Sequence, residues 1–308
     1  MSLKSLNIPV INFVGNRKYA LIFSAILLVV SIASIGFQGL KFGIDFTGGT
    51  LIELGYEKTA DLEDIRSKLI SANYKGTNVQ YFGSDTEVLI QLEPQAATSA
   101  QLSSSIIRML GDGLDVRRVE FVGPKVGEEL TNDGGLAMLY ALIGILIYVA
   151  FRFEYRFALG SIAALVHDVI ITIGIFSLLQ IEFDLTVLAA ILAVIGYSLN
   201  DTIVVFDRIR ENFLSTRHIE PGPIVNDALN QTLSRTLMTS LTTLIVLLAL
   251  FYLGGEVIHS FAGALIIGVV IGTYSSIYVA SSMILALGIS KEDMLPSEKE
   301  KKEIDARP

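Results

Sequence analysis

The sequence contains no cysteine. Disulfide bonds, cysteine nucleophiles and zinc sites built from thiolates are therefore excluded. Charged residues are also scarce, because they make up 18% of the 308 residues while hydrophobic residues make up 52%. The mean hydropathy of +0.58 is too high for an ordinary soluble chain and indicates a membrane protein. The net charge of -8 argues against a nucleic acid as partner.

Six apolar runs are each close to the ~20 residues that a helix needs to cross a bilayer. They are Tyr19 to Leu40, Leu136 to Phe151, Phe157 to Leu179, Leu185 to Phe206, Leu237 to Leu253 and Phe261 to Leu287. The second run is short, so we expect its helix to begin nearer Asn132. The sequence thus predicts a polytopic α-helical membrane protein with six transmembrane helices.

Lysine and arginine are distributed unevenly between the loops. They occur before the first run, at 152–156, at 207–235 and in the tail, whereas the short loops 180–184 and 254–259 contain none. Because basic residues mark cytoplasmic loops, both termini should be cytoplasmic. A signal-peptidase pattern at Ser31-Ile32-Ala33 is the alternative for the first run. The run continues past that pattern through Phe37, so we expect a retained helix.

These features divide the chain into four parts. Residues 1–40 form the N-terminus and first helix, and 41–132 form a soluble α+β domain. Residues 133–289 form helices two to six with a cytoplasmic loop at 207–235, and 290–308 form a charged, disordered tail. Within the loop, a short amphipathic helix over 224–234 is expected to lie along the membrane surface.

The soluble segment shows an alternating order of strands and helices. Strands are expected at 50–56, 77–82, 87–92 and 116–122, and helices at 61–72 and 98–110, with Thr59 as a helix cap. The order β-α-β-β-α-β is that of a ferredoxin-like fold. The segment has no convergent cluster of histidine and carboxylates, and Gly48-Gly49 precedes a strand rather than a helix. Binding or positioning is therefore its expected role, not catalysis or nucleotide binding.

Asn200 and Asp201 stand side by side inside the fourth apolar run. A charged, unpaired side chain at such a depth costs roughly 2.5 to 3.5 kcal/mol. Tyr197 lies one turn earlier on the same helix face. The carboxyl of Asp201 either ties helices together or serves a functional path, and the cost of its burial favours the path.

His167 and Asp168 form a second pair of ionisable residues, about eleven residues into the third run. They are either a neutral pair hydrogen-bonded inside the bundle or a proton relay. No spacing rule brings them to Asp201, so we expect them to lie at a different depth and to tune the path.

Arg235 precedes a hydroxyl stripe that contains Thr239 and Thr242. It is either a positive-inside anchor or the start of a polar path. In the last run, Gly268 and Gly272 predict close helix packing.

Several motifs together resemble one known family. They are residues 42–50, which contain Asp45, Gly48 and Gly49; residues 123–127, which contain Gly123 and Gly127; His167-Asp168; residues 196–212; residues 233–236; and residues 272–276. The chain resembles the SecF family of membrane subunits that act with SecD in bacterial protein export, within the resistance-nodulation-division superfamily. The match covers nearly the whole chain.

The resemblance implies a multi-pass protein of the cell inner membrane that forms a heterodimer with SecD. It implies further partners in the SecYEG channel and YajC, with YidC as another candidate, and an unfolded preprotein as the substrate. Such a complex uses the proton motive force to complete translocation after the ATP-driven SecA step. Protons are then the coupling ion, and no cofactor or enzymatic activity is expected.

By the same resemblance, Asp201 and Arg235 correspond to the family's proton-pathway residues, and the soluble domain lies in the periplasm. Two alternatives remain. A small-molecule/proton antiporter of the same superfamily usually has twelve helices and two large periplasmic domains, so the length of this chain disfavours it. In a passive scaffold of the export machinery, Asp201 and Arg235 would be structural.

Overall fold

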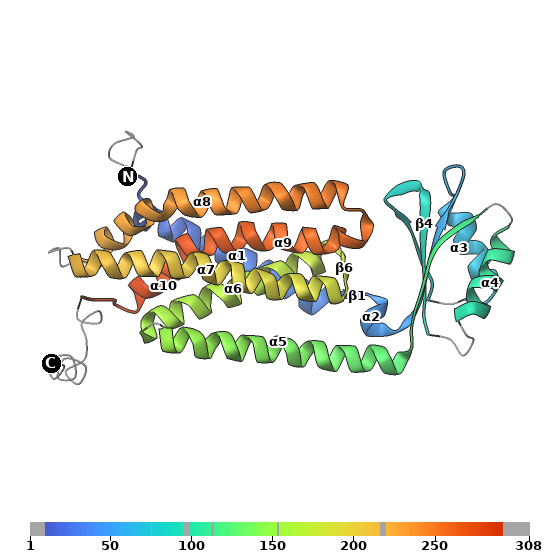
Figure 1. Ribbon diagram of the computed structural model, residues 1–308, viewed down its shortest axis with the longest axis horizontal. Helices are drawn as coiled ribbons and strands as arrows, with labels where there is room; N and C mark the ends of the chain where they lie inside the picture. The colour runs from blue at the N-terminus through green and yellow to red at the C-terminus, as the bar shows by residue number, and fades with distance from the viewer. Residues whose placement is uncertain are drawn as a thin grey trace, which may run out of the picture.

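The computed structural model describes residues 10–74, 76–94, 99–111, 114–152, 154–215 and 220–291. A bundle of long helices carries a small α+β domain at one end (Figure 1). Among the described residues, six helices are long and apolar enough to cross a membrane, which confirms the six predicted spans. They are α1 (Phe13–Gln38), α5 (Pro124–Arg152), α6 (Tyr155–Leu179), α7 (Leu185–Ser215), α8 (Pro221–Leu253), and a last span built from α9 (Glu256–Ser275), the π-helix η2 (Ser276–Ala280) and α10 (Ser281–Ala286).

Three helices extend beyond the predicted boundaries. Helix α5 begins at Pro124, inside the segment predicted to belong to the soluble domain. The non-helical part of the predicted loop 207–235 is shorter than the sequence suggested, because α7 continues to Ser215 and α8 already begins at Pro221. Proline suits the first turn of a helix, where its missing N–H is not needed, so Pro221 starts α8. The predicted tail from residue 292 onward lies outside the described residues.

The separate amphipathic helix predicted over 224–234 is also wrong, because these residues form the first turns of α8. Their apolar face, with Ile224, Val225, Ala228 and Leu229, is buried in the core of the bundle. Packing against neighbouring helices therefore replaces the contact with a membrane surface that the sequence pattern suggested.

The soluble domain has the strand and helix order expected from the sequence. The elements are β2 (Gly49–Gly55), α3 (Leu62–Ser71), β3 (Asn78–Phe82), β4 (Ser84–Leu92), α4 (Ser99–Leu110) and β5 (Asp115–Val122). The strands form one sheet in the order β3-β4-β2-β5, in which all neighbours are antiparallel. Ile52, Leu54 and Ile90 of the sheet pack against α3 and α4 in one buried cluster. Asp61, not Thr59, caps α3 by accepting from the backbone N–H of residues 63 and 64.

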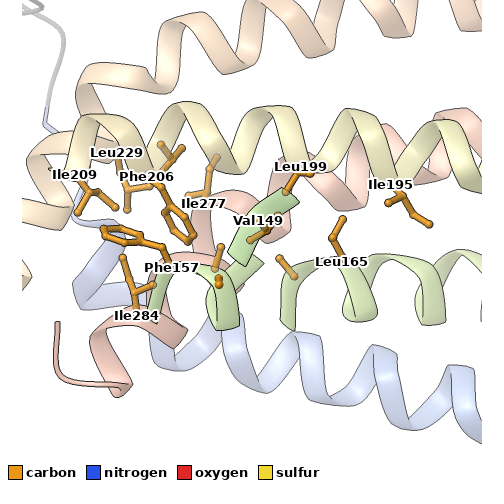
Figure 2. Close-up of a cluster of buried hydrophobic side chains, with 14 of the residues drawn as sticks. Val149, Phe157, Leu165, Ile195, Leu199, Phe206, Ile209, Leu229, Ile277 and Ile284 are labelled. Atoms are coloured by element: carbon orange, nitrogen blue, oxygen red, sulfur yellow. The ribbon is translucent and has the colours of Figure 1, made fainter. Parts of the chain in front are cut away.

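The bundle core lies between α6, α7 and the last span. Phe157 of α6 faces Phe206 of α7 with ring centroids 4.8 Å apart, and Ile277 and Ile284 lie beside them (Figure 2). Gly160 allows this approach, since a Cβ there would lie 2.9 Å from Ile284. The core therefore fixes α6 and α7 against each other next to the buried polar residues described below.

Small residues bring α9 close to α7, as the glycine pair predicted. A Cβ on Gly268 would lie 2.0 Å from Val194 Cγ2, and one on Gly272 would lie 3.0 Å from Ser198 Cβ. Helix α1 packs through serines instead: apart from Phe13, its buried residues are Ser24, Ser31 and Ser34. Its apolar side chains mostly face outward, as expected for a helix whose surroundings are lipid.

Two asparagines fasten the start of α1 to α8. Asn230 Oδ1 accepts from the backbone N–H of Ile11 at 2.9 Å, and Asn230 Nδ2 donates to the carbonyl of Ile11 at 2.9 Å. One turn earlier on α8, Asn226 Oδ1 accepts from the backbone N–H of Val14 at 3.2 Å. The extended start of α8 is thus tied to the first helix by side chain to backbone bonds.

Candidate functional site

His167 and Asp168 of α6 are both buried, with 3% and 1% of their surface exposed. His167 Nδ1 and Asp168 Oδ1 are 2.9 Å apart, so the ring and the carboxyl share a hydrogen bond. His167 Nε2 lies 3.1 Å from Ser24 Oγ on α1. A hydroxyl can donate to a bare nitrogen or accept from a protonated one. The imidazole therefore has a partner on each nitrogen in either protonation state.

Asp168 Oδ2 is held by two serines from two other helices. Ser275 of α9 donates to it at 2.7 Å, and Ser198 of α7 donates to it as well. Together with Ser24, these bonds make the His167–Asp168 pair a meeting point of α1, α6, α7 and α9.

Tyr274 extends this network toward α1. Its hydroxyl lies 3.1 Å from Ser24 Oγ and donates to the carbonyl of Ala20 at 2.6 Å. Its ring stacks on His167 with centroids 6.2 Å apart. Ser24 therefore contacts both the histidine and the tyrosine, and a change at the imidazole reaches the backbone of α1 through two side chains.

Asp201 of α7 is 3% exposed, and its Oδ2 has no hydrogen-bond partner among the described residues. It follows Ser198 by three residues, which is ~4.5 Å along the helix. The next residue, Thr202, also has a buried hydroxyl without such a partner. Asp201 Oδ2 can thus take up a proton or a hydrogen bond without breaking a contact within the described chain.

Tyr197 lies at the contact of α7 with α8 and α9. Its hydroxyl donates to Ser240 Oγ at 3.2 Å, and Ser240 Oγ lies 2.7 Å from Thr273 Oγ1. Asp201 is one turn further along α7, and Thr236 is one turn earlier on antiparallel α8. The hydroxyl of Thr236 is buried and, within the described part of the chain, unpartnered. The helix repeat therefore places Asp201 and Thr236 at the next contact along the interface of α7 with α8, the α7–α8 seam.

Asn200 and Arg235 differ from the other predicted site residues because both side chains are exposed. No described basic side chain forms an ion pair with Asp201, and Arg235 interacts with it only at longer range. The structure thus brings His167 and Asp168 together with serines, sets Tyr197 and Asp201 on one seam, and leaves Asn200 and Arg235 on the outside of the bundle.

The glycines of the two remaining motifs meet at α2 (Ile44–Thr47), at the base of the soluble domain. A Cβ on Gly127 of α5 would lie 2.9 Å from Gly48 N, and one on Gly48 would lie 3.2 Å from the carbonyl of residue 122. Gly49 has a φ of 132°, which side chains rarely adopt. Gly123 has only one neighbour near its Cβ position, the ring of Phe121 at 3.9 Å. Close backbone packing therefore requires Gly48 and Gly127, and the backbone conformation requires Gly49.

Sequence reasoning missed the partners of the His167–Asp168 pair. Neither Ser24 nor Ser275 was singled out as a hydrogen-bond partner. One signal was present: Ser24, Ser31 and Ser34 interrupt an otherwise apolar run at intervals of seven and three residues. That spacing puts them on one helix face, where hydroxyls would meet other helices and not lipid.

Comparison with known proteins gives consistent matches. A family model described as "Protein export membrane protein SecD/SecF, C-terminal" matches residues 103–290, and one described as "SecD/SecF GG Motif" matches residues 33–60. The protein translocase subunit SecF of Vibrio alginolyticus is 53% identical over 97% of both chains. That of Pseudomonas aeruginosa is 47% identical over 99% of this chain and 100% of its own.

Solved structures show the same similarity. The crystal structure of SecDF, a translocon-associated membrane protein from Thermus thermophilus, matches with a TM-score of 0.84 at 41% identity over 91% of this chain. A crystal structure of SecDF in a super-membrane-facing form matches with a TM-score of 0.68 at 38% identity over 97% of this chain. The matched regions are 39% and 40% of those longer chains, so this chain corresponds to about two fifths of each.

Proposed function

The chain belongs to the SecD/SecF family of protein export membrane proteins, and we propose that it couples proton movement through its helix bundle to preprotein export. Its relatives carry the name protein translocase subunit SecF. We assign it the SecF role, with SecD as the partner that corresponds to the other three fifths of the SecDF chains. SecYEG and YajC, with YidC as a further candidate, complete the proposed assembly in the inner membrane.

Asp201 carries this proposal. It is a buried carboxyl in a membrane-spanning helix, and its Oδ2 has no hydrogen-bond partner among the described residues. Keeping such a group inside a membrane is costly, and intramembrane carboxyls mark proton and ion paths. Tyr197, Ser240 and Thr236 supply hydroxyls along the same seam.

Arg235 and the His167–Asp168 pair take supporting roles in this proposal. Arg235 stays charged at every relevant pH and interacts with Asp201 at long range, so movement of α8 changes the field at the carboxyl. His167 and Asp168 of α6 share a hydrogen bond and are bonded through serines to α1, α7 and α9. Helix movement and proton binding would then be linked at both sites.

The proposed orientation follows from the positions of the helix ends. Helix α1 begins, and α10 ends, at the end of the bundle opposite the soluble domain (Figure 1). With these ends on the cytoplasmic side, as the basic residues favour, the domain lies in the periplasm. Its antiparallel strand order β3-β4-β2-β5 supports the ferredoxin-like fold proposed for it.

The test is proton-driven export in vesicles that contain the chain with SecD and the SecYEG channel. Asp201→Asn keeps the shape of the side chain but cannot exchange a proton, so export should no longer respond to the proton gradient. Asp207→Asn, the same substitution six residues further along α7, is the matched control and should retain the response. Gradient-driven export at the wild-type level in Asp201→Asn would make the chain a passive scaffold at this site.

A further inference from the structure

The segment that links α1 to the soluble domain is bound to the connection between α6 and α7. Strand β1 (Lys41–Phe42) pairs in parallel with β6 (Glu182–Phe183). Beyond the pair, the backbone N–H of Gly43 donates to the carbonyl of Phe183 at 2.9 Å. A Cβ on Gly43 would lie 3.0 Å from Glu182 Oε1, so only glycine fits without displacing that side chain. The two segments, 140 residues apart in sequence, are thus held together through their backbones.

Asp45 then reaches from this segment to the first turn of α7. Its Oδ2 accepts from the backbone N–H of Leu185 at 3.0 Å. Asp184, directly before the helix, accepts from the N–H of Val187 at 2.8 Å. The first N–H groups of a helix have no partner within it, and negative charge is favoured there. Helix α7 therefore receives one cap from Asp184, directly before it, and a second from Asp45 in the segment that leads into the soluble domain.

Asp45 belongs to α2, and α2 is also fixed to α5. Thr131 Oγ1 lies 3.4 Å from the carbonyl of Phe46, and the Gly127 and Gly48 backbones pack closely there. The chain enters the soluble domain through α2 and leaves it through β5 into α5. Both connections of the domain to the bundle thus converge on α2.

Beside α2, a pocket of about 360 Å³ lies between the domain and the bundle, and Asp45 itself lines it. Gln80, Tyr81 and Arg118 line it from the sheet, and Gln180 and Thr186 line it from the bundle. In the described parts of the chain, no extensive contact joins the sheet or its two helices directly to the membrane-spanning helices. The domain is therefore attached through α2 and the adjoining linker, where Lys41 also donates to Gln80 of the sheet at 3.2 Å, and this narrow attachment has the geometry of a pivot.

We propose that Asp45 is a positioning residue that transmits the orientation of the soluble domain to α7. The link rests on the proposed function, because α7 also carries Asp201, sixteen residues or ~24 Å from Leu185 along the helix. A rigid helix capped by the domain's own linker moves with that linker. Tilting of the domain then changes the position of α7, and a shift of α7 at Asp201 changes the tilt of the domain.

The contact requires an acceptor oxygen and does not require a proton. Asparagine supplies the same oxygen and is as good a helix cap as aspartate. Asp45→Asn should therefore keep the link, whereas Asp45→Ala should remove it. A role of Asp45 in carrying protons predicts the opposite for Asp45→Asn, so the pair of variants separates the two.

Because this chain has no cysteine, two introduced cysteines are the sites at which it can be spin-labelled before it is assembled with SecD. Ser71→Cys on α3 and Tyr252→Cys on α8 are exposed positions on the domain and the bundle. Pulsed electron spin resonance then measures the distribution of distances between them in the full chain assembled with SecD in vesicles. Exchange of the Leu185 amide with deuterium reports directly on the cap.

We expect Asp45→Ala to broaden or shift the distance distribution and to speed up exchange at Leu185, with Asp45→Asn close to wild type in both. The matched control is Asp61→Ala, which removes the cap of α3 inside the domain and should leave the distances unchanged. A wild-type distribution in Asp45→Ala would overturn the proposal, and so would an Asp45→Asn protein that behaves like Asp45→Ala. These readouts need neither a proton gradient nor export, so they stay informative if Asp201→Asn retains export and the proposed function fails.

Discussion

Ser198 of α7 donates a hydrogen bond to Oδ2 of Asp168 on α6, and Asp201 follows on α7 less than one turn later. The two buried carboxyls are therefore connected to the same short stretch of one helix. The sequence led us to expect the His167–Asp168 pair at a different depth from Asp201, and the separation along α7 is only ~4.5 Å. A displacement of α7 acts on both sites at once.

Asp168→Asn should destabilise the bundle. The amide offers one oxygen where the carboxylate uses two, so either the histidine or the two serines lose their acceptor. Loss of a buried hydrogen-bond partner costs about 1–3 kcal/mol of the free energy of unfolding, measurable by unfolding in mild detergent. Thr172→Val is the control, since that hydroxyl donates only to the backbone carbonyl of Asp168. An equal decrease in the free energy of unfolding in Asp168→Asn and Thr172→Val would argue against a special role for the Asp168 side chain.

Gly268→Ala should disturb the contact of α9 with α7. The new Cβ would lie 2.0 Å from Val194 Cγ2, and such overpacking costs about 1–3 kcal/mol. Val194→Ala in the same protein should restore part of the loss, because it removes the clashing methyl groups. Gly196→Ala on α7, whose new Cβ has no neighbour within 4 Å among the described residues, should leave the unfolding midpoint nearly unchanged. Additive effects of the two substitutions would contradict the predicted contact.

Asn230→Ala should loosen the start of α1. The variant loses the acceptor for the N–H of Ile11 and the donor for its carbonyl. We expect faster hydrogen exchange at the Ile11 amide, while the Val14 amide, held by Asn226, keeps more of its protection. Gln231→Ala, at the next and exposed position of α8, serves as the control. Unchanged exchange at Ile11 would show that the helix start is held by other contacts.

Glu182 should make the pairing of β1 with β6, at the base of the soluble domain, sensitive to pH. Burial raises the pKa of its carboxyl above the ordinary value near 4.5; Lys41 opposes this, and Asp184 and Asp45 add to it. The folded state therefore keeps a proton that the unfolded chain has already lost. The contribution of this proton to the free energy of unfolding is fully present below the ordinary pKa and is lost as the pH rises through the raised pKa.

The measurement is the pH dependence of hydrogen exchange at the Gly43 amide, which bonds to the carbonyl of Phe183. Protection should decrease as the pH rises above the ordinary glutamate range, and Glu182→Gln should remove that dependence. Arg118 and Glu120 line the same pocket and form an ion pair with each other, so Glu120→Gln tests whether the pocket as a whole responds. A pH dependence that persists in Glu182→Gln would assign it to another group.

The sequence predicted the number of spans and the order of elements in the soluble domain. Both depend on patterns that a single segment carries: a run of apolar residues long enough for a bilayer, or alternation along a strand. The ends of α5, α7 and α8 were mispredicted because these helices continue as polar or amphipathic segments outside the apolar runs. Ile224 and Val225 are buried because they pack against other helices. The local sequence pattern does not reveal which helices these are.

For the candidate site, the sequence identified the ionisable residues whose burial costs free energy, but not the residues that bond to them. His167, Asp168 and Asp201 are conspicuous because ionisable side chains are rare in apolar runs. Ser24, Ser240 and Thr273 are not conspicuous, since small hydroxyl residues are common wherever helices pack. Whether such a hydroxyl meets Asp168, Tyr197 or only its own backbone depends on how α1, α8 and α9 cross α6 and α7.

The π-helix η2 interrupts the last span between two positions that must keep their directions. Ser275 before it bonds to Asp168, and Ile284 after it fills the space above Gly160. A π turn closes its hydrogen bonds over i→i+5 and so accommodates one residue more than an α turn does. Removing one residue from 276–280 lets the turn close to ordinary α-helix while both flanks keep their partners. A scan of single-residue deletions between Val269 and Ile284 should therefore find its greatest tolerance within Ser276–Ala280.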